Sequence, residues 1–108
     1  KIERWSSEEI VLPYKSPVDG RVHRYFPDFW IEQRDESGKL STMVIEVKPK
    51  AQCGPPKKPK TKTTKSKYRY LREMKTWKVN EAKWKVAEEF CAERKWTFKL
   101  LTEDHLVK

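Results

Sequence analysis

The chain contains 108 residues, carries a net charge of +9 at pH 7 and has charged side chains at 38% of its positions. This length predicts one small domain with a single modest core, to which five Trp, four Tyr and four Phe contribute large apolar areas. The sequence contains no apolar run of about eighteen residues and no recognisable signal peptide, so it argues against membrane insertion and secretion.

The positive charge is concentrated in one segment. Residues 48–67 contain eight Lys and no acidic residue, so eight of the nine net positive charges belong to this stretch. Such a segment suits a polyanion, because neutralising phosphates releases counterions. A solvated, disordered loop has the same composition. Because the segment adjoins Glu46 and Lys48, we favour nucleic acid as its binding partner.

The two Cys indicate neither a zinc site nor a disulfide framework. Cys53 and Cys91 are widely spaced, and His23 and His105 do not stand at ligand-like spacing from either. We therefore interpret the Cys as a reduced pair in a cytosolic protein.

The first half of the chain predicts three strands. Residues 1–7 show no clear pattern, whereas residues 8–14 contain a short apolar run that predicts a first strand. Asp19-Gly20 is a strong hairpin-turn signal. Apolar and β-branched residues then predict strands over 29–33 and 40–47. Because the three strands follow one another closely, we expect an antiparallel meander.

The second half of the chain predicts a loop followed by helices. Residues 49–66 are rich in Lys, Pro and Thr, which cannot bury a core, so we expect a mobile loop. One helix is expected over 67–76, and another from Asn80, a favourable N-cap, to about residue 95. A single helix over 67–95 is the alternative, because the break signal between the two is only moderate.

The second predicted helix has a clear buried face. Trp84, Ala87, Phe90 and Cys91 recur at three- and four-residue spacing. Residues 96–101 predict a final strand, and the helical crossover places it parallel to the strand that precedes the loop. We therefore expect one domain of α/β class, with a mixed sheet of about four strands and flanking helices.

Two carboxylates and an ammonium group are predicted to meet at the end of one strand. Glu46 interrupts an apolar strand, where a charge is costly unless it is paired or binds a metal. Lys48 stands two residues later and shares its face of the strand. Asp28 opens the neighbouring strand and offers a second carboxylate. Hard oxygen ligands beside an ammonium group predict a site for Mg²⁺ and a phosphate.

Each of these residues also has a simpler interpretation. Glu46 could face solvent on a half-exposed strand. Asp28 could be a turn acid, since Pro-Asp is a common turn pair. Lys48 could be the first residue of the basic loop. The order and spacing of the three together favour the metal site.

The same residues resemble the signature of a nuclease superfamily. Pro27-Asp28 followed by Glu46-Val47-Lys48 resembles the PD-(D/E)XK motif, and the immediate flanks are similar to its TnsA-like branch. Further stretches resemble the head-completion nucleases of T-even-type tailed phages, namely 10–14, 16–17, 80–84 and 100–103. The resemblance covers most of the chain outside the Lys-rich segment.

The resemblance implies a restriction-endonuclease-like core and Mg²⁺-dependent DNA cleavage, in which Mn²⁺ can substitute. It implies that Asp28, Glu46 and the Val47 carbonyl hold the metal, and that Asp28, Glu46 and Lys48 are catalytic. Such enzymes usually carry a further Glu on a helix before the first strand. Here that helix would precede Lys1, so we expect the N-terminal helix to be missing and this chain to be impaired as a nuclease.

Several other residues are candidates with weaker support. Glu8 and Glu9 are nearby acids that could replace the upstream Glu, although they belong to the predicted first strand. His23 lies where related transposase nucleases have a His, but beside aromatic residues it is more simply structural. Lys83 could face DNA or solvent. The residues expected to contact DNA are Lys50, Lys57, Lys58, Lys60, Lys62, Lys65, Lys67 and Lys83.

Three functions fit these observations to different degrees. The first is an Mg²⁺-dependent endonuclease acting in phage head completion after DNA packaging, in the host cytoplasm and the virion. Its partners would be DNA and phage head or portal components. The alternative is a non-catalytic structural protein that binds DNA and plugs or stabilises the filled capsid. Such a protein would not need paired carboxylates and a Lys, so their presence favours the enzyme. An RNA-binding module is disfavoured, because the chain lacks an aromatic RNP-like pattern and a GXXG loop.

Overall fold

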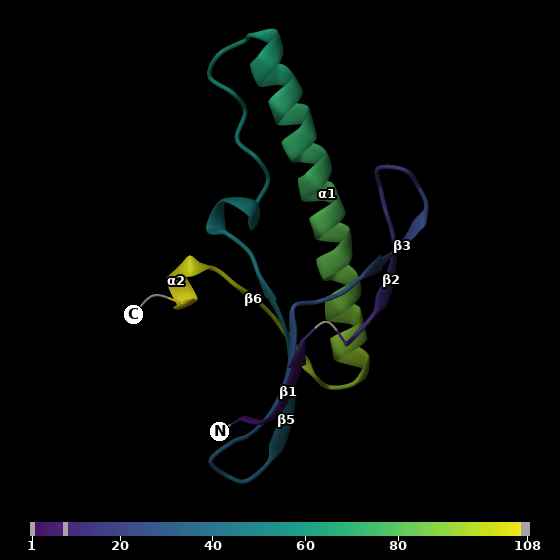
Figure 1. The fold of residues 1–108 in the computed structure, drawn as a ribbon, viewed down its shortest axis with the longest axis vertical. Coiled ribbons are helices and arrows are strands. Elements are labelled where there is room, and N and C mark those ends of the chain that lie inside the picture. The colour runs from purple at the N-terminus through teal and green to yellow at the C-terminus, as the bar shows by residue number, and fades with distance from the viewer. Residues whose placement is uncertain (1, 8, 107–108) are drawn as a thin grey trace.

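The computed structural model describes residues 2–7 and 9–106. In chain order the elements are β1 (Ile2–Ser7), β2 (Leu12–Lys15), β3 (Val22–Tyr25), β4 (Phe29–Arg34), β5 (Leu40–Val47), the 3₁₀ turn η1 (Lys50–Gln52), α1 (Thr64–Glu93), β6 (Thr97–Leu101) and α2 (Glu103–Leu106) (Figure 1).

A four-stranded mixed sheet forms the centre of the fold, in the order β1-β4-β5-β6. The pairs β1–β4 and β4–β5 are antiparallel, whereas β5 and β6 are parallel with Glu46 opposite Leu100. Parallel neighbours need a crossover connection, and α1 provides it. The predicted α/β class, the mixed sheet and the parallel last strand are confirmed.

The N-terminal strands differ from the predicted meander. Residues 2–7 form the edge strand β1, which the sequence pattern did not indicate. The predicted first strand begins only at Leu12, and it pairs with β3 in a separate two-stranded sheet. The hairpin leaves the main sheet because its apolar side chains, from Leu12, Tyr14 and Tyr25, join a core cluster with Trp84 on α1. The predicted Asp-Gly turn closes this hairpin.

Of the two alternative acids of the N-terminal region, the structure describes only Glu9. Glu9 is an exposed residue between β1 and β2. Glu8 lies outside the described residues. The expectation that both belong to a first strand is therefore wrong for Glu9.

Helix α1 is continuous over 30 residues, so the predicted division into two helices is wrong. Its N-cap is Thr63, whose hydroxyl accepts a hydrogen bond from the Ser66 backbone N–H at 3.2 Å. Asn80 lies in the middle of the helix, where an ordinary residue costs at most about 0.7 kcal/mol relative to Ala, too little to break it. The preceding loop ends at Thr63, so Lys65 and Lys67 belong to α1.

The predicted buried face of the helix is confirmed. Trp84, Ala87 and Cys91 are buried, and Phe90 is partly buried against the same core. Both Cys are free, Cys91 in the core and Cys53 after η1.

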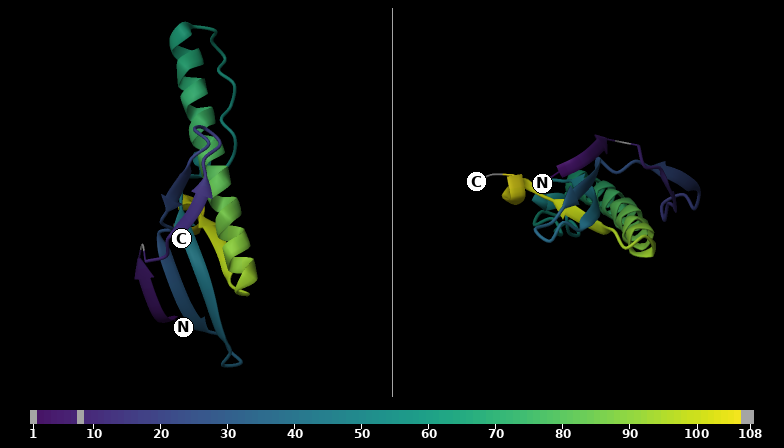
Figure 2. Two further views of the ribbon diagram at one scale, coloured as in Figure 1. Left: turned by 90° about the vertical axis from the view of Figure 1, so that its right-hand side faces the viewer. Right: turned by 90° about the horizontal axis from the view of Figure 1, so that it is seen from below.

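The molecule is elongated because α1 extends beyond the sheet. Its principal dimensions are 57 × 37 × 19 Å, and 30 helical residues alone span about 45 Å. The segment after η1 runs alongside the N-terminal half of α1 to its far end (Figures 1 and 2). Most of the Lys-rich segment therefore lies away from the sheet. No helix within the described ranges is long and apolar enough to cross a membrane.

Candidate active site

Glu46 is the buried acid around which the site is built. It is the penultimate residue of β5 and only 5% exposed. The Tyr25 hydroxyl donates a hydrogen bond to its Oε1 at 2.7 Å, and the Lys48 Nζ lies 3.6 Å from its Oε2. The predicted shared face of Glu46 and Lys48 is therefore confirmed, and Glu46 does not face solvent.

Asp28 reaches the same end of β5 from the neighbouring strand. Phe29 pairs with Ile45 in the β4–β5 ladder, so the residue before Phe29 comes level with Glu46. The Asp28 Oδ2 accepts a hydrogen bond from the Val47 backbone N–H at 2.8 Å. Asp28 is thus tied to the strand that carries the second carboxylate, which a simple turn acid would not be.

The pKa of Glu46 is raised, because neighbouring groups compensate only part of the effect of burying its carboxylate. Burial raises the pKa of Glu46, and the nearby Asp28 charge acts in the same direction. The Tyr25 hydrogen bond and the charges of Lys48 and Lys83 lower this pKa and oppose the burial effect. Burial and the Glu46 carboxylate raise the pKa of Tyr25, which keeps its hydroxyl a hydrogen-bond donor.

The donor set fits a hard divalent cation. The Asp28 Oδ1 and Glu46 Oε2 atoms have no hydrogen bond to any described residue, so each is able to accept a ligand. No group of three or more His, Cys, Asp and Glu side chains with metal-site geometry occurs in the described part of the chain. Mg²⁺ is commonly held by one or two carboxylates, with water and phosphate oxygens completing its shell. The Val47 peptide lies beside Asp28, and its carbonyl as a ligand stays a prediction.

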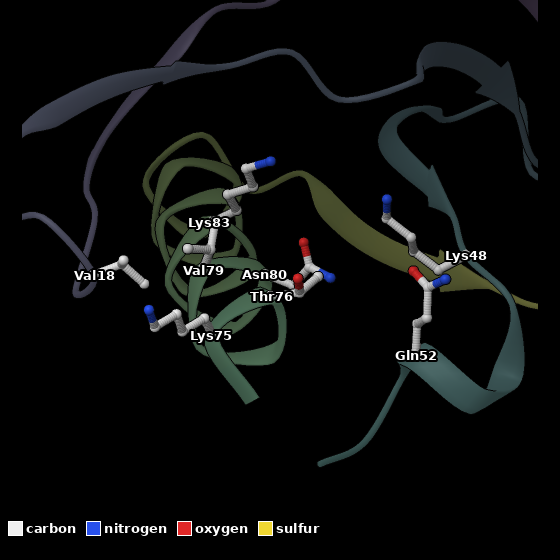
Figure 3. Close-up of a pocket in the computed structure, with 8 residues that line it drawn as sticks. All are labelled: Val18, Lys48, Gln52, Lys75, Thr76, Val79, Asn80 and Lys83. Atoms are coloured by element: carbon white, nitrogen blue, oxygen red, sulfur yellow. The ribbon is translucent and has the colours of Figure 1, made fainter. Parts of the chain in front are cut away.

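A cavity of about 400 Å³ lies next to Lys48, which lines it (Figure 3). Its walls come from the tip of the β2–β3 hairpin, the segment after β5 and the middle of α1. The lining residues are Val18, Lys48, Gln52, Lys75, Thr76, Val79, Asn80 and Lys83.

Lys83 lines this cavity and lies over two aromatic rings, and a contact of Lys83 with DNA stays a prediction. Its Nζ lies 5.7 Å from the centre of the Tyr14 ring and 5.6 Å from that of the Tyr25 ring. A cation above two aromatic rings is attracted by their electron density. Lys83 therefore adds a second positive charge close to Glu46, whose hydrogen-bond donor is the same Tyr25.

The other predicted DNA contacts lie apart from the carboxylates. Lys57, Lys58, Lys60 and Lys62 are exposed on the loop, and Lys65 and Lys67 are exposed on the first turns of α1. Lys50 instead pairs with α2, because its Nζ lies 3.1 Å from the Asp104 Oδ2 and its backbone N–H donates to Glu103. DNA binding by these residues stays a prediction.

Three residues of the site were not predicted in this role. Tyr25 carries a hydrogen bond to Glu46, while Gln52 and Asn80 line the cavity. A signal for Asn80 exists in the sequence, because it is the polar member of a helical stripe that continues with Trp84 and Ala87. Tyr25 gave no such signal, since its partner lies on another sheet.

His23 has a structural setting. Its Nε2 lies 2.8 Å from the Asp19 Oδ2, and its ring stacks on Tyr14 with the ring centres 5.8 Å apart. Both partners belong to the β2–β3 hairpin region. The structural interpretation of His23 is therefore supported.

Comparisons with known proteins identify the family of this chain. The family model described as "TnsA-like endonuclease N terminal" matches residues 1–103. The head completion nuclease of Enterobacteria phage T4 is 42% identical over 106 residues, which cover 98% of this chain and 68% of that protein. No solved structure matches the chain at a significant level. The chain therefore belongs to the TnsA-like endonucleases, a branch of the PD-(D/E)XK nucleases.

Proposed function

We propose that the protein is a metal-dependent endodeoxyribonuclease that hydrolyses phosphodiester bonds during phage head completion, after DNA has been packaged. The observation that carries this proposal is the meeting of Asp28, Glu46 and Lys48 at one end of β5. The role in head completion is supported by the 42% identical phage T4 protein, which bears that name. Phage head or portal components would be partners, in the host cytoplasm and the virion.

Two carboxylates would hold the cation, Mg²⁺ or Mn²⁺, together with the Val47 carbonyl. When bound, it would polarise the scissile phosphate and lower the pKa of a coordinated water. The protein's own contribution is to keep the carboxylates in place. The Tyr25 hydroxyl holds the Glu46 Oε1, and the Val47 N–H holds the Asp28 Oδ2, which leaves one oxygen of each carboxylate for the metal.

Lys48 is placed to hold the attacking water and to contact the scissile phosphate. Its Nζ lies 3.6 Å from the Glu46 Oε2, so an attacking water held by the ammonium group would be next to the carboxylate. An ammonium donor also stabilises the negative charge that develops on the phosphoryl oxygens. Lys48 would thus orient the water and stabilise the transition state.

The DNA would extend from the carboxylates along α1. From Lys83 to Lys67 the helix rises by about 24 Å, which corresponds to roughly seven base pairs at 3.4 Å each. Beyond Lys67 lie the exposed Lys side chains of the loop. This arrangement would let one duplex contact the cutting site and the basic end of the molecule together.

A plasmid-nicking assay on the full-length protein tests the proposal. Supercoiled DNA should be converted to nicked and linear forms in Mg²⁺ or Mn²⁺, with 5′-phosphate ends, and should stay intact with a chelator. The non-catalytic alternative predicts that the protein retards DNA on a gel and leaves it uncut in every metal. That result, obtained with folded protein, would overturn the enzyme assignment.

A further inference from the structure

We propose that Asn80 is a phosphate-binding residue, which together with Lys83 holds the DNA phosphate next to the scissile one. This inference rests on the proposed function, because it names how the same site holds its substrate. It assigns a role to a side chain that the carboxylates and Lys48 do not require for the chemical step.

The first observation is that Asn80 is buried without a partner. The residue is only 5% exposed, its carboxamide forms no hydrogen bond to any residue in the described ranges, and it borders the cavity. Among the described residues, only Ser6 Oγ and Trp84 Nε1 are enclosed side-chain polar atoms without a partner, so the Asn80 amide keeps access to the cavity and can donate to a ligand there. Asn80 lies between Trp77 and Trp84 on the inward face of α1, where it is a polar residue among aromatic ones.

The second observation is that the carboxamide is directed into a cavity with the chemistry of an anion site. Figure 3 shows Asn80 and Thr76 projecting from α1 toward the side on which Lys48 and Gln52 lie. All the charged side chains that line this cavity are Lys, and no carboxylate is among the lining residues. A phosphodiester has two unbridged oxygens and one negative charge, and it accepts hydrogen bonds from ammonium and amide donors.

The cavity is joined to the cutting site through two side chains. Lys48 lines the cavity and lies 3.6 Å from Glu46. Lys83 also lines it and lies over the ring of Tyr25, which donates to Glu46. A phosphate bound here would be a neighbour of the one at the carboxylates. The lack of lining carboxylates makes the cavity unsuitable for a metal ion.

The test compares two Asn80 variants in the full-length protein by single-turnover cleavage in Mg²⁺ and by thermal unfolding. Asn80→Leu removes the donor at similar size and should weaken apparent DNA affinity about ten- to a hundredfold, the range for a hydrogen bond to a charged group. Its melting temperature should stay close to that of the wild type, because the Asn80 carboxamide forms no hydrogen bond within the described residues that the substitution would remove. Asn80→Asp places a negative charge in the cavity and should weaken affinity further.

A neutral phosphate identifies the contact directly. In DNA with a mapped cleavage position, a single methylphosphonate next to the cut should weaken binding to the wild type more than binding to Asn80→Leu, since in the variant only the Lys83 contact to that phosphate remains to be lost. Lys85→Ala is the matched control. Lys85 is exposed on the same helix outside the cavity, so its replacement should leave the loss of affinity caused by the methylphosphonate unchanged.

The outcomes separate this inference from the proposed function. Wild-type DNA affinity in both Asn80 variants, with Asp28→Ala inactive, would overturn the phosphate site and leave the nuclease. A loss of affinity that comes with a lower melting temperature in Asn80→Leu, and with an unchanged methylphosphonate effect, would assign Asn80 a structural role and also overturn it. If the wild type binds DNA without cutting, the nuclease proposal fails, and the affinity measurements still decide about Asn80.

Discussion

Glu46 belongs to the candidate site, but its buried charge lowers the stability of the fold. Its carboxylate is buried at the end of β5, and burial raises its pKa above the ordinary value for Glu. Tyr25, Lys48 and Lys83 oppose this effect without removing it. A folded-state pKa above the unfolded value means that the ionised acid lowers stability at neutral pH.

Replacing this acid by its neutral isostere should therefore stabilise the protein while inactivating it. Glu46→Gln keeps an oxygen for the Tyr25 hydroxyl and removes the buried charge. We expect a higher melting temperature at pH 8, where each kcal/mol gained appears as about 4 to 8 °C in a domain of this size. The gain should shrink as the pH falls toward about 4.3, where the wild-type acid becomes protonated in both states.

Thermal unfolding of the two proteins between pH 4.5 and 8 is the measurement. Glu36→Gln is the control, because Glu36 is an exposed acid in the β4–β5 turn and should show no comparable gain. A Glu46→Gln protein that melts below the wild type at pH 8 would show that the ionised carboxylate stabilises the fold.

The Tyr25 hydroxyl should set the lower pH limit of activity. Its hydrogen bond lowers the pKa of Glu46, so its removal in Tyr25→Phe should raise that pKa further. A metal ligand must be deprotonated, and the acidic limb of the pH–rate profile should therefore move to higher pH. We also expect a loss of about 1.5 to 3 kcal/mol in stability, as for hydrogen bonds to charged groups.

Cleavage rates measured from pH 5.5 to 9 test this prediction. Tyr68→Phe serves as control, since Tyr68 is exposed on α1 far from the carboxylates along the helix. An acidic limb that stays in place in Tyr25→Phe would mean that Glu46 does not govern it.

At the scale of elements, the sequence pattern predicted those features that depend only on residues close together in the chain, such as strand alternation and helical periodicity. The β4–β5 hairpin and the shared face of Glu46 and Lys48 follow from strand alternation. The stripe of Trp84, Ala87 and Cys91 follows from the helical period. These elements, and the positions of Glu46 and Lys48 at the end of β5, were therefore predictable.

Features that depend on packing between distant segments were not predictable. The β2–β3 hairpin leaves the main sheet because its side chains pack against α1. This packing places the Tyr25 hydroxyl within hydrogen-bond distance of Glu46. Tyr25 was missed for this reason, because its partner Glu46 lies far away in sequence.

The loop of the Lys-rich segment should contribute to DNA binding and not to stability. Changing Lys57, Lys58, Lys60 and Lys62 to Ser leaves the Thr63 cap and α1 intact. The slope of log affinity against log salt falls by roughly 0.9 for each phosphate that the protein no longer neutralises, and a mobile loop rarely engages every Lys at once. We expect the slope to fall by about two to three, with little change in melting temperature.

Salt titrations of DNA binding measure this slope. The control replaces four exposed Lys elsewhere, Lys39, Lys85, Lys95 and Lys99, and therefore removes the same charge. Equal slopes for the loop variant and the wild type would mean that the loop is only a solvated linker.

At the scale of the whole molecule, the fold separates the candidate active site from most of the exposed Lys side chains of the basic segment. The sheet, the β2–β3 hairpin and the middle of α1 surround the carboxylates and the cavity. The extended half of α1 and the accompanying loop carry exposed positive charge away from them (Figure 1). Changes to Asp28, Glu46 and Lys48 should therefore affect the rate of cleavage at saturating DNA, whereas changes at the far end should affect affinity.

The central claim is that Asp28, Glu46 and Lys48 form the centre that cuts DNA, and the most direct test is the single-turnover cleavage rate at saturating DNA in Mg²⁺. We predict that Asp28→Ala, Glu46→Gln and Lys48→Ala each lower this rate by about a hundredfold or more while the proteins remain folded. The carboxylate control Glu36→Ala should cut at the wild-type rate. A folded Asp28→Ala or Glu46→Gln protein that cuts as fast as the wild type would contradict the account.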